Sequence, residues 1–208
     1  MSDGSPPPRL ILASTSPRRL ALLRQAGIEP DAIMDPGIDE TVVAGELPRL
    51  HALRLAGAKA AAVAARVADD SSGGGRPFGL AADTVVACGR RILPKASTRA
   101  EAERCLDLLS GRRHRVYTGV CVHAPDGRAR SRLACTVVRF KRLSAEERAD
   151  YLAAGEWHGK AGGYAIQGRA EAFVAGLNGT YSNVVGQPVH DTVNLLRGLG
   201  WRPPPPRR

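Results

Sequence analysis

The 208-residue sequence has few aromatic residues, 4% of the chain, and no apolar run long enough to cross a membrane. A membrane-spanning helix needs about 20 predominantly apolar residues, so we expect no membrane contact of that kind. The opening MSDGSPPPR also lacks the basic and then apolar order of a secretory signal. With hydrophobic residues at 43%, we expect a folded domain whose core is built mainly from Ala, Val, Leu and Ile.

Metal-site and disulfide spacings are missing too. The four cysteines, Cys88, Cys105, Cys121 and Cys135, form no CxxC pair and no dense framework. The five histidines form no HExxH or other zinc spacing. We therefore expect the protein to work in a reducing cytoplasm.

Negative charge is in deficit, with 20 Asp and Glu against 30 Lys and Arg, a formal net charge of +10. Such an excess is typical of proteins that bind nucleic acid, an anionic membrane surface or small phosphorylated ligands, and also of a merely solvated surface. Residues 128–142 hold six basic residues and no acid. Aromatic residues for base stacking are few, however, and no nucleic-acid motif is recognisable, so the sequence disfavours nucleic acid as a partner.

Residue patterns predict one α/β domain over 9–200, flanked by Pro-rich tails at 1–8 and 201–208. We expect strands over 9–13, 78–87, 91–93, 115–123 and 130–140. Helices are expected from Pro17 to a stop at Gly27, over 48–68 and 98–109, from a Ser144 cap, and over 189–199. The composition of residues 69–77 predicts a flexible loop, and Asn178-Gly179 predicts a turn. The mixture of βα units and antiparallel pairs indicates a mixed sheet.

The first candidate site is the loop Ser14-Thr15-Ser16 and the helix start Pro17-Arg18-Arg19. Backbone N–H groups and the positive end of a helix dipole meet at such a turn, and Arg18 and Arg19 add two cations. This combination suits a polyanion such as a triphosphate. The alternative is an ordinary helix start with Ser16 as N-cap and two solvated arginines.

Acidic residues form the second candidate site. Asp83 follows an apolar run, and Asp39-Glu40 lies in a segment with little regular pattern. Together these carboxylates could hold a hard cation such as Mg²⁺, although each alone could be a turn residue or a solvated acid. Lys95 beside a phosphate would stabilise developing charge, and it could equally be a surface lysine.

The third candidate is the glycine-rich run 159–168, GKAGGYAIQG, which includes Lys160 and Gln167. Glycines permit close approach of the backbone to a ligand. The run matches neither a Walker motif nor the dinucleotide pattern GxGxxG. The amide of Gln167 can both donate and accept hydrogen bonds, as reading a nucleobase edge requires.

Four segments taken together resemble the Maf family of nucleoside triphosphate pyrophosphatases. They are LILASTSPRR (10–19), AADT (81–84), GKAGGYAIQG (159–168) and NGTYSNVVGQP (178–188), and the likeness runs in order from about residue 9 to 199. The resemblance implies an α/β, two-lobed, mixed-sheet, ITPase-like (Maf/Ham1) fold with a central cleft. It also implies hydrolysis of a nucleoside triphosphate to monophosphate and pyrophosphate with Mg²⁺ or Mn²⁺, and a homodimer.

The same resemblance implies roles for particular residues. Asp83 is expected to be the general base, and the other catalytic residues are expected to be Arg19, Glu40 and Lys95. Glu40 and Asp83 are expected to hold the metal ion. The residues expected to bind substrate are Ser14, Ser16, Arg18, Arg19, Thr84, Lys160 and Gln167.

Arg18, Thr84 and Gln167 are the expected specificity residues, because they match the dTTP/UTP branch of the family. The branch that cleaves 7-methyl-GTP carries Trp, Gln and Glu at these places. Two departures stand out: Lys95 lies in Pro-Lys-Ala where the family usually has Lys-Pro, and Gln187 replaces the usual Leu. Two alternatives stay open, a 7-methyl-GTP pyrophosphatase and a regulatory septum-formation inhibitor whose role is binding.

Overall fold

A seven-stranded mixed sheet forms the centre of the computed structural model, which describes residues 8–68 and 75–203. The strands are β1 (Leu10–Leu12), β2 (Ala32–Ile33), β3 (Phe78–Cys88), β4 (Arg91–Leu93), β5 (Arg113–His123), β6 (Ala129–Phe140) and β7 (Val174–Asn178). Their order is β2-β1-β3-β5-β6-β7, with β4 paired to β3. β1 is parallel to β2 and β3, and the pairs from β3 to β7 are antiparallel. The predicted mixed α/β sheet is confirmed.

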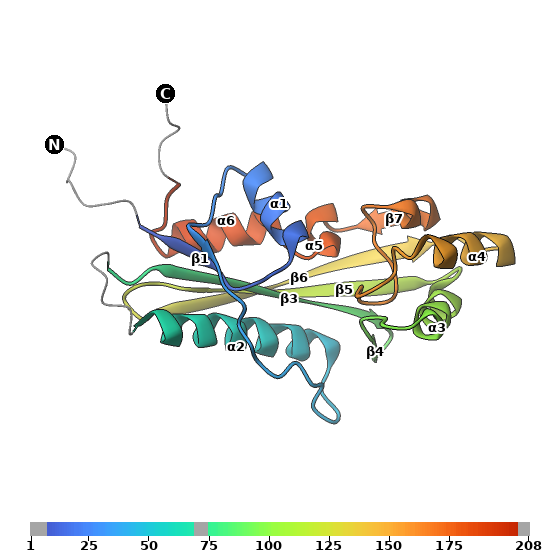
Figure 1. Cartoon of the computed structure of the whole chain (residues 1–208), viewed down its shortest axis with the longest axis horizontal. Coiled ribbons are helices and arrows are strands. Elements are labelled where there is room, and N and C mark those ends of the chain that lie inside the picture. Colours follow the sequence, from blue (N-terminus) through green and yellow to red (C-terminus); the bar gives the residue numbers. More distant parts are fainter. Residues whose placement is uncertain (1–7, 69–74, 204–208) are drawn as a thin grey trace.

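The helices lie on both faces of the sheet (Figure 1). They are α1 (Pro17–Gln25), α2 (Pro48–Ala68), α3 (Arg99–Leu109), α4 (Ala145–Ala154), α5 (Tyr181–Val185), α6 (Val189–Gly198) and the 3-10 helix η1 (Arg169–Phe173). Figure 1 shows α2 along one face, with α1, α5 and α6 on the other. No helix in the described ranges combines the length and hydropathy needed to cross a membrane.

α2 lies unusually close to the sheet because both surfaces are small. The Ala-rich helix places the carbonyl oxygen of Ala52 where a Cβ on Gly119 would come within 2.3 Å of it. Ala56, Ala60 and Val63 continue this buried stripe against β1, β3 and β5. Because α2 lies close to the sheet, the side chains of α2 reach the end of β1, where the cleft lies.

Larger apolar side chains fill the other face. α3 and α4 pack over Val116, Val138 and Phe140, and α6 packs over Val120 and Val122. The expected capping box at Ser144 is present, since Glu147 N donates to Ser144 Oγ at 3.1 Å. Ser16 stands at the N-cap of α1 as expected, but its side chain makes no capping hydrogen bond.

The predicted boundaries need two corrections. Trp201, which we place in a tail, is 3% exposed and packs with Leu196 and Leu199. Its Nε1 donates to the carbonyl of Pro8 at 3.0 Å, so the folded domain includes both residues. The rest of the predicted tails, apart from Arg202 and Pro203, and most of the predicted 69–77 loop lie outside the described residues.

The residue patterns did not predict β7, which runs into the predicted turn at Asn178-Gly179. The residues of β7, VAGLN, include Ala and Gly and are mostly exposed, so they carry little of the alternating apolar pattern of a strand. Pairing with β6 from Val137 to Phe140 makes them a strand.

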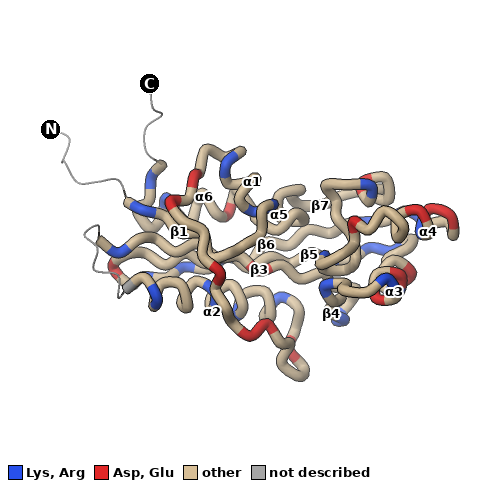
Figure 2. Tube along the Cα trace, viewed as in Figure 1, with Lys and Arg blue, Asp and Glu red and all other residues tan. Residues whose placement is uncertain are grey.

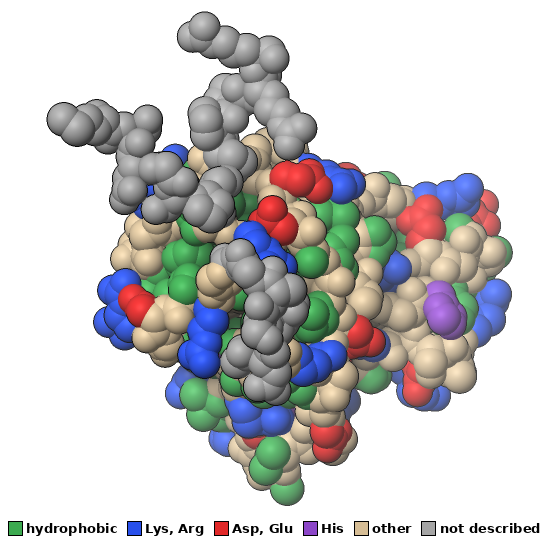
Figure 3. Space-filling model, turned by 60° about the vertical axis from the view of Figure 1, so that its left-hand side comes forward, with side chains coloured by type: hydrophobic (Ala, Val, Ile, Leu, Met, Phe, Trp, Pro, Cys, Tyr) green, Lys and Arg blue, Asp and Glu red, His purple; other side chains and the backbone are tan. Residues whose placement is uncertain are grey.

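Basic residues are spread along the chain (Figure 2). On the face seen in Figure 3, Lys and Arg side chains lie in separate groups among acidic and apolar ones. A continuous basic stripe, as expected of a surface that tracks a nucleic-acid backbone, is not seen on that face.

Candidate active site

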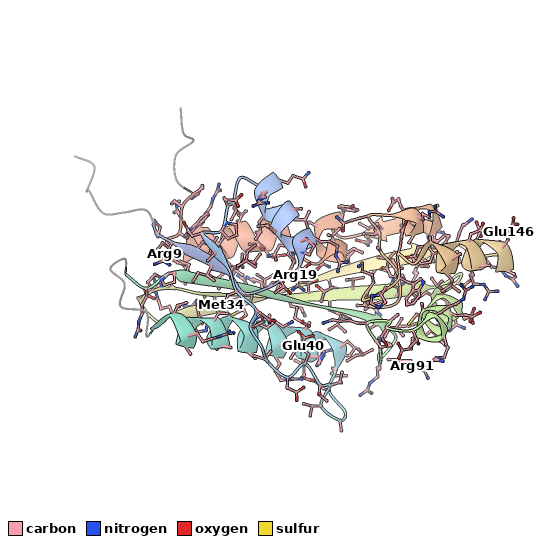
Figure 4. All side chains as sticks on the ribbon, in the orientation of Figure 1. Arg9, Arg19, Met34, Glu40, Arg91 and Glu146 are labelled. Atoms are coloured by element: carbon pink, nitrogen blue, oxygen red, sulfur yellow. The ribbon has the colours of Figure 1, made fainter. Side chains whose placement is uncertain are left out.

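A cleft of about 400 Å³ opens where the β1–α1 connection, the middle of β3 and the glycine-rich run 159–168 meet. All ten residues expected in the site line it: Ser14, Ser16, Arg18, Arg19, Glu40, Asp83, Thr84, Lys95, Lys160 and Gln167. Figure 4 shows Arg19 at the start of α1 and Glu40 in the segment that leads to α2, on the two sides of the sheet. Segments separated by more than 100 residues in sequence therefore converge on one space.

Lys59 lies between the two expected metal-binding carboxylates. Its Nζ is 2.6 Å from Asp83 Oδ1 and 2.6 Å from Glu40 Oε1. Lys59 and Asp83 are 4% and 3% exposed, so the pair is shielded from water. Buried charges persist only when paired, and here one ammonium stabilises two carboxylates.

The sequence patterns do not predict Lys59 as a site residue. A signal was available in its position. Ala52, Ala56, Lys59 and Val63 follow one another at helical spacings of four, three and four, so Lys59 falls on the buried stripe. A lone lysine on an apolar helical face requires a buried anionic partner.

Glu40 reaches the same place from the exposed segment before α2. Its second carboxylate oxygen forms an ion pair with Lys95. Burial raises the pKa of Glu40, but hydrogen bonds from Lys59 and Lys95 outweigh burial and lower the pKa to about 2. The side chain is consequently an anion throughout the neutral range.

The two carboxylates fit a hard divalent cation. Both converge on one ammonium, and oxygen atoms are the ligands that Mg²⁺ and Mn²⁺ prefer. No group of three or more His, Cys, Asp and Glu gathers within residues 8–68 and 75–203. A Mg²⁺ ion held by one or two carboxylates completes its shell with water and substrate phosphates, so two protein ligands suffice.

Arg19 is held from three directions. Its Nε donates to the carbonyl of Gly186 at 2.8 Å, and its Nη1 donates to Ser14 Oγ at 3.0 Å. Nη2 lies 3.4 Å from Thr84 Oγ1. Burial lowers the pKa of Arg19, and Asp83 partly offsets this. Because a guanidinium does not lose its proton in proteins, Arg19 is a fixed cation in the cleft.

Arg18 and Lys160 add two more cations, and Lys160 Nζ donates to the carbonyl of His158 at 3.2 Å. Burial lowers the pKa of both, and the charge of Arg18 lowers the pKa of Lys160 further. Lowered pKa values mean that their positive charges are only partly compensated by the surroundings. An anionic ligand between them would supply the missing compensation.

Backbone hydrogen bonds join the glycine-rich run to the segment that carries Lys95. Gly162 N donates to Pro94 O at 2.9 Å, and Ala96 N donates to Lys160 O at 3.1 Å. Gly162 has a φ of +71°, and a Cβ there would lie 2.8 Å from Val86 Cγ1. The unusual Pro-Lys-Ala order is thus accommodated, since Lys95 pairs with Ala161 and still reaches Glu40.

Two tyrosines support the same run from the core. Tyr151 Oη accepts a hydrogen bond from Ala165 N at 3.1 Å, and Tyr164 Oη lies 2.8 Å from His114 Nε2. Burial lowers the pKa of His114 to about 4, so its imidazole is neutral at pH 7. With the run anchored below, the exposed Gln167 is presented at the rim of the cleft.

The site combines two carboxylates, several cations and an exposed amide on a mixed α/β sheet. Such a site defines a class of protein that can hold a polyanion together with a divalent cation. Comparison with known proteins narrows this class. The family described as "Maf-like protein" matches residues 9–199, and the chain belongs to that family.

Curated relatives cover nearly the whole chain. The dTTP/UTP pyrophosphatase of Caulobacter vibrioides is 58% identical over 196 residues, which are 94% of this chain and 98% of the relative. The dTTP/UTP pyrophosphatase of Rhodopseudomonas palustris strain CGA009 is 60% identical over 195 residues, 93% of each chain.

Solved structures show a more distant similarity. A nucleoside-triphosphatase, dITP/XTP pyrophosphatase, from Mycobacterium abscessus is 18% identical with a TM-score of 0.40, covering 66% of this chain and 75% of its own. The Staphylococcus aureus Ham1 protein is 15% identical with a TM-score of 0.41, covering 64% and 71%.

Proposed function

We propose that this chain hydrolyses dTTP and UTP to the monophosphate and pyrophosphate, and so removes unwanted nucleotides from the pool. The observation that carries the proposal is the convergence of all ten expected residues on one cleft. The relatives named dTTP/UTP pyrophosphatase support the same substrates. CTP and modified pyrimidine nucleotides are further candidate substrates of the same cleft.

Four cations would bind the triphosphate. Arg18 and Arg19 lie in the first turn of α1, where a helix N-terminus favours an anion, and Lys95 and Lys160 line the same cleft. Charged donors of this kind stabilise the negative charge that builds up on a leaving pyrophosphate. Arg19, fixed by its three contacts, would orient the phosphate chain.

The reaction is an in-line attack of water on the α-phosphorus. The water oxygen forms the new bond to phosphorus, and the bond to the oxygen bridging the α- and β-phosphates breaks, so pyrophosphate leaves. Asp83 takes the proton of the attacking water, and its ion pair with Lys59 holds that carboxylate in place. Mg²⁺ or Mn²⁺ held by Glu40 and Asp83 would supply Lewis-acid polarisation of the phosphate oxygens when bound.

Selection of the nucleobase would depend on Gln167, together with Arg18 and Thr84. A neutral amide at the cleft rim can donate to and accept from the uncharged imide of thymine or uracil. A cationic 7-methylguanine would be favoured by a carboxylate instead, because charge-assisted hydrogen bonds are the stronger ones.

A pyrophosphate-release screen over common and methylated nucleotides, with Mg²⁺ and with Mn²⁺, tests the proposal. We expect dTTP and UTP to be the best substrates and activity to disappear with a chelator. A preference for 7-methyl-GTP would overturn the assignment of specificity, and no release from any nucleotide would overturn the enzymatic function.

We also propose that the protein acts in the cytoplasm as a homodimer, as the family resemblance implies. Gel filtration coupled to light scattering tests the dimer, and a mass of one chain would contradict it. If the protein instead inhibits septum formation by binding alone, an Asp83→Asn variant would keep the division phenotype without turnover.

A further inference from the structure

The face of the sheet that α2 covers is left open at one end. Ala52 of α2 lies over Gly119 of β5, and α2 begins only four residues earlier, at Pro48. Four helical residues span about 6 Å, which corresponds to about two residues along a strand. The N-terminus of α2 therefore lies near Tyr117. Arg115 and Arg113 of β5 lie beyond it and are exposed to solvent.

A groove of about 410 Å³ occupies this open region, and we call it the arginine groove. The lining residues that lie on the α2 face of the sheet are Arg113, Arg115, Val137, Arg139, Gly176 and Asn178. The strand register establishes that shared face. Arg113 lies opposite Arg139, which in turn lies opposite Gly176, and residues directly opposite in an antiparallel pair point to the same side. None of the residues lining this groove lines the active-site cleft.

The groove has a fixed wall at Arg139. Its Nη2 donates to the carbonyl of Ala175 at 2.7 Å. A Cβ built on Gly176 would lie 3.4 Å from both Nε and Nη2 of Arg139, so the guanidinium rests on the bare backbone of β7. Arg139 therefore extends over β7, away from Arg113, which lies opposite it on β5.

Charge within the groove is uncompensated. Five arginines in the described ranges form salt bridges with carboxylates, namely Arg24, Arg54, Arg128, Arg148 and Arg169. Arg113, Arg115 and Arg139 form no salt bridge with any described carboxylate. Like charges directly opposite on a sheet are destabilising, so an anion in the groove would relieve an unfavourable interaction.

We propose that the arginine groove is a second anion-binding site, separate from the active-site cleft, for a small phosphate polyanion such as pyrophosphate. A guanidinium group can bind two phosphate oxygens at once, and three arginines line the groove. The volume lies in the range of small-ligand pockets. No Phe, Tyr or Trp lines the groove to stack on a base, which favours a small phosphate compound over single-stranded nucleic acid.

Calorimetric titration of the full chain with pyrophosphate, without divalent cation, tests this proposal. The variant is Arg113→Gln/Arg115→Gln. A matched control is Arg130→Gln/Arg132→Gln, which removes the same charge at the same spacing from exposed positions of β6. We expect the groove variant to bind one equivalent of pyrophosphate fewer than wild type, or to bind that equivalent at least tenfold more weakly, and the control to match wild type.

Parallel titrations with inorganic phosphate and with dTMP distinguish a free phosphate from a nucleotide as the source of the anion. Binding of either that is lost in the groove variant supports the site. Arg139→Gln should reproduce the loss, and the melting temperature of the double variant should stay at or above the wild-type value, since repulsion is removed.

Identical pyrophosphate isotherms for wild type and the groove variant would overturn the proposal. Equal loss in the groove variant and the control would also overturn it, because the effect would then follow net charge. Binding of a DNA duplex that depends on Arg113 and Arg115, with no pyrophosphate binding there, would replace it with a nucleic-acid surface. dTTP hydrolysis by the groove variant should equal that of wild type, so this test is independent of the proposed enzymatic function.

Discussion

Asp83 and Thr84 are neighbours in sequence, yet they belong to opposite faces of β3. On the α2 face, Asp83 contacts the ammonium of Lys59, which also pairs with Glu40. On the other face, Thr84 Oγ1 lies 3.0 Å from Thr118 Oγ1, which in turn is 3.2 Å from the carbonyl of Asn183. One face is an arrangement of charges and the other a chain of neutral hydrogen bonds.

Both faces reach one cleft because β3 has an open edge between them. β1 pairs with β3 only as far as Leu80, and β4 pairs with it only from Val86 onward. In the described sheet, residues 81–85 have no partner strand on that side. A ligand in the cleft can therefore meet side chains from both faces, with the charged face suited to the reaction and the neutral face suited to holding Arg19.

Replacing Asp83 and Thr84 one at a time tests whether the two faces of β3 have different tasks. Asp83→Asn keeps the shape but removes the proposed base, and we expect the kcat for dTTP to fall by at least about 10³-fold, roughly 4 kcal/mol of barrier. Thr84→Val removes a hydroxyl from the neutral face and should change kcat by less than about tenfold, about 1.4 kcal/mol. Pyrophosphate release measures both, and comparable losses would show that the two faces do not divide their tasks.

Removing Lys59 tests how strongly the charged face is held. Lys59→Met leaves the buried carboxylate of Asp83 without its ion pair, so the free energy of unfolding should fall by about 3 kcal/mol. Urea denaturation at pH 7 is the measurement. The control is Lys95→Met, which removes another partner of Glu40 from a side chain that is 56% exposed. That variant should lose less than about 1 kcal/mol, and equal losses would contradict the importance of burial.

The pH dependence of stability gives a smaller and graded test. Lysine hydrogen bonds outweigh burial and lower the pKa of Glu40 from 4.5 to about 2. A lowered carboxylate pKa stabilises the fold fully above about pH 4.5, and this contribution is lost as pH falls toward about 2. The difference in unfolding free energy between wild type and Glu40→Gln should stay constant from pH 5 to 8, a window above both values. A difference that already shrinks between pH 8 and 6 would assign the ionisation to another group.

The smallest expected effect lies on the neutral face, where α5 leads into α6. Gln187 is fully buried, its Nε2 donates to Thr192 Oγ1 at 2.8 Å, and its Oε1 has no hydrogen-bond partner among the described residues. Gln187→Leu removes that unsatisfied oxygen at similar volume, so we expect a gain of about 1 kcal/mol in unfolding free energy. Thermal and urea unfolding would show it, and a loss of stability would mean that the amide is better satisfied than its contacts suggest.

Local motifs made much of the fold predictable. The helix start at Pro17 and the capping box at Ser144 each depend on residues close in sequence, and both are present. β7 was not predictable in the same way. Its residues lack a strand pattern of their own and become a strand only through pairing with β6.

The sequence by itself predicted ten site residues, from short motifs and from the resemblance to the Maf family, and all ten line one cleft. Only the tertiary structure decided that Lys59 joins Asp83 to Glu40, that Trp201 belongs to the core, and that Arg113 lies opposite Arg139. Helix packing and strand register bring these residues together over long stretches of chain, and the amino-acid pattern does not show which partners they meet.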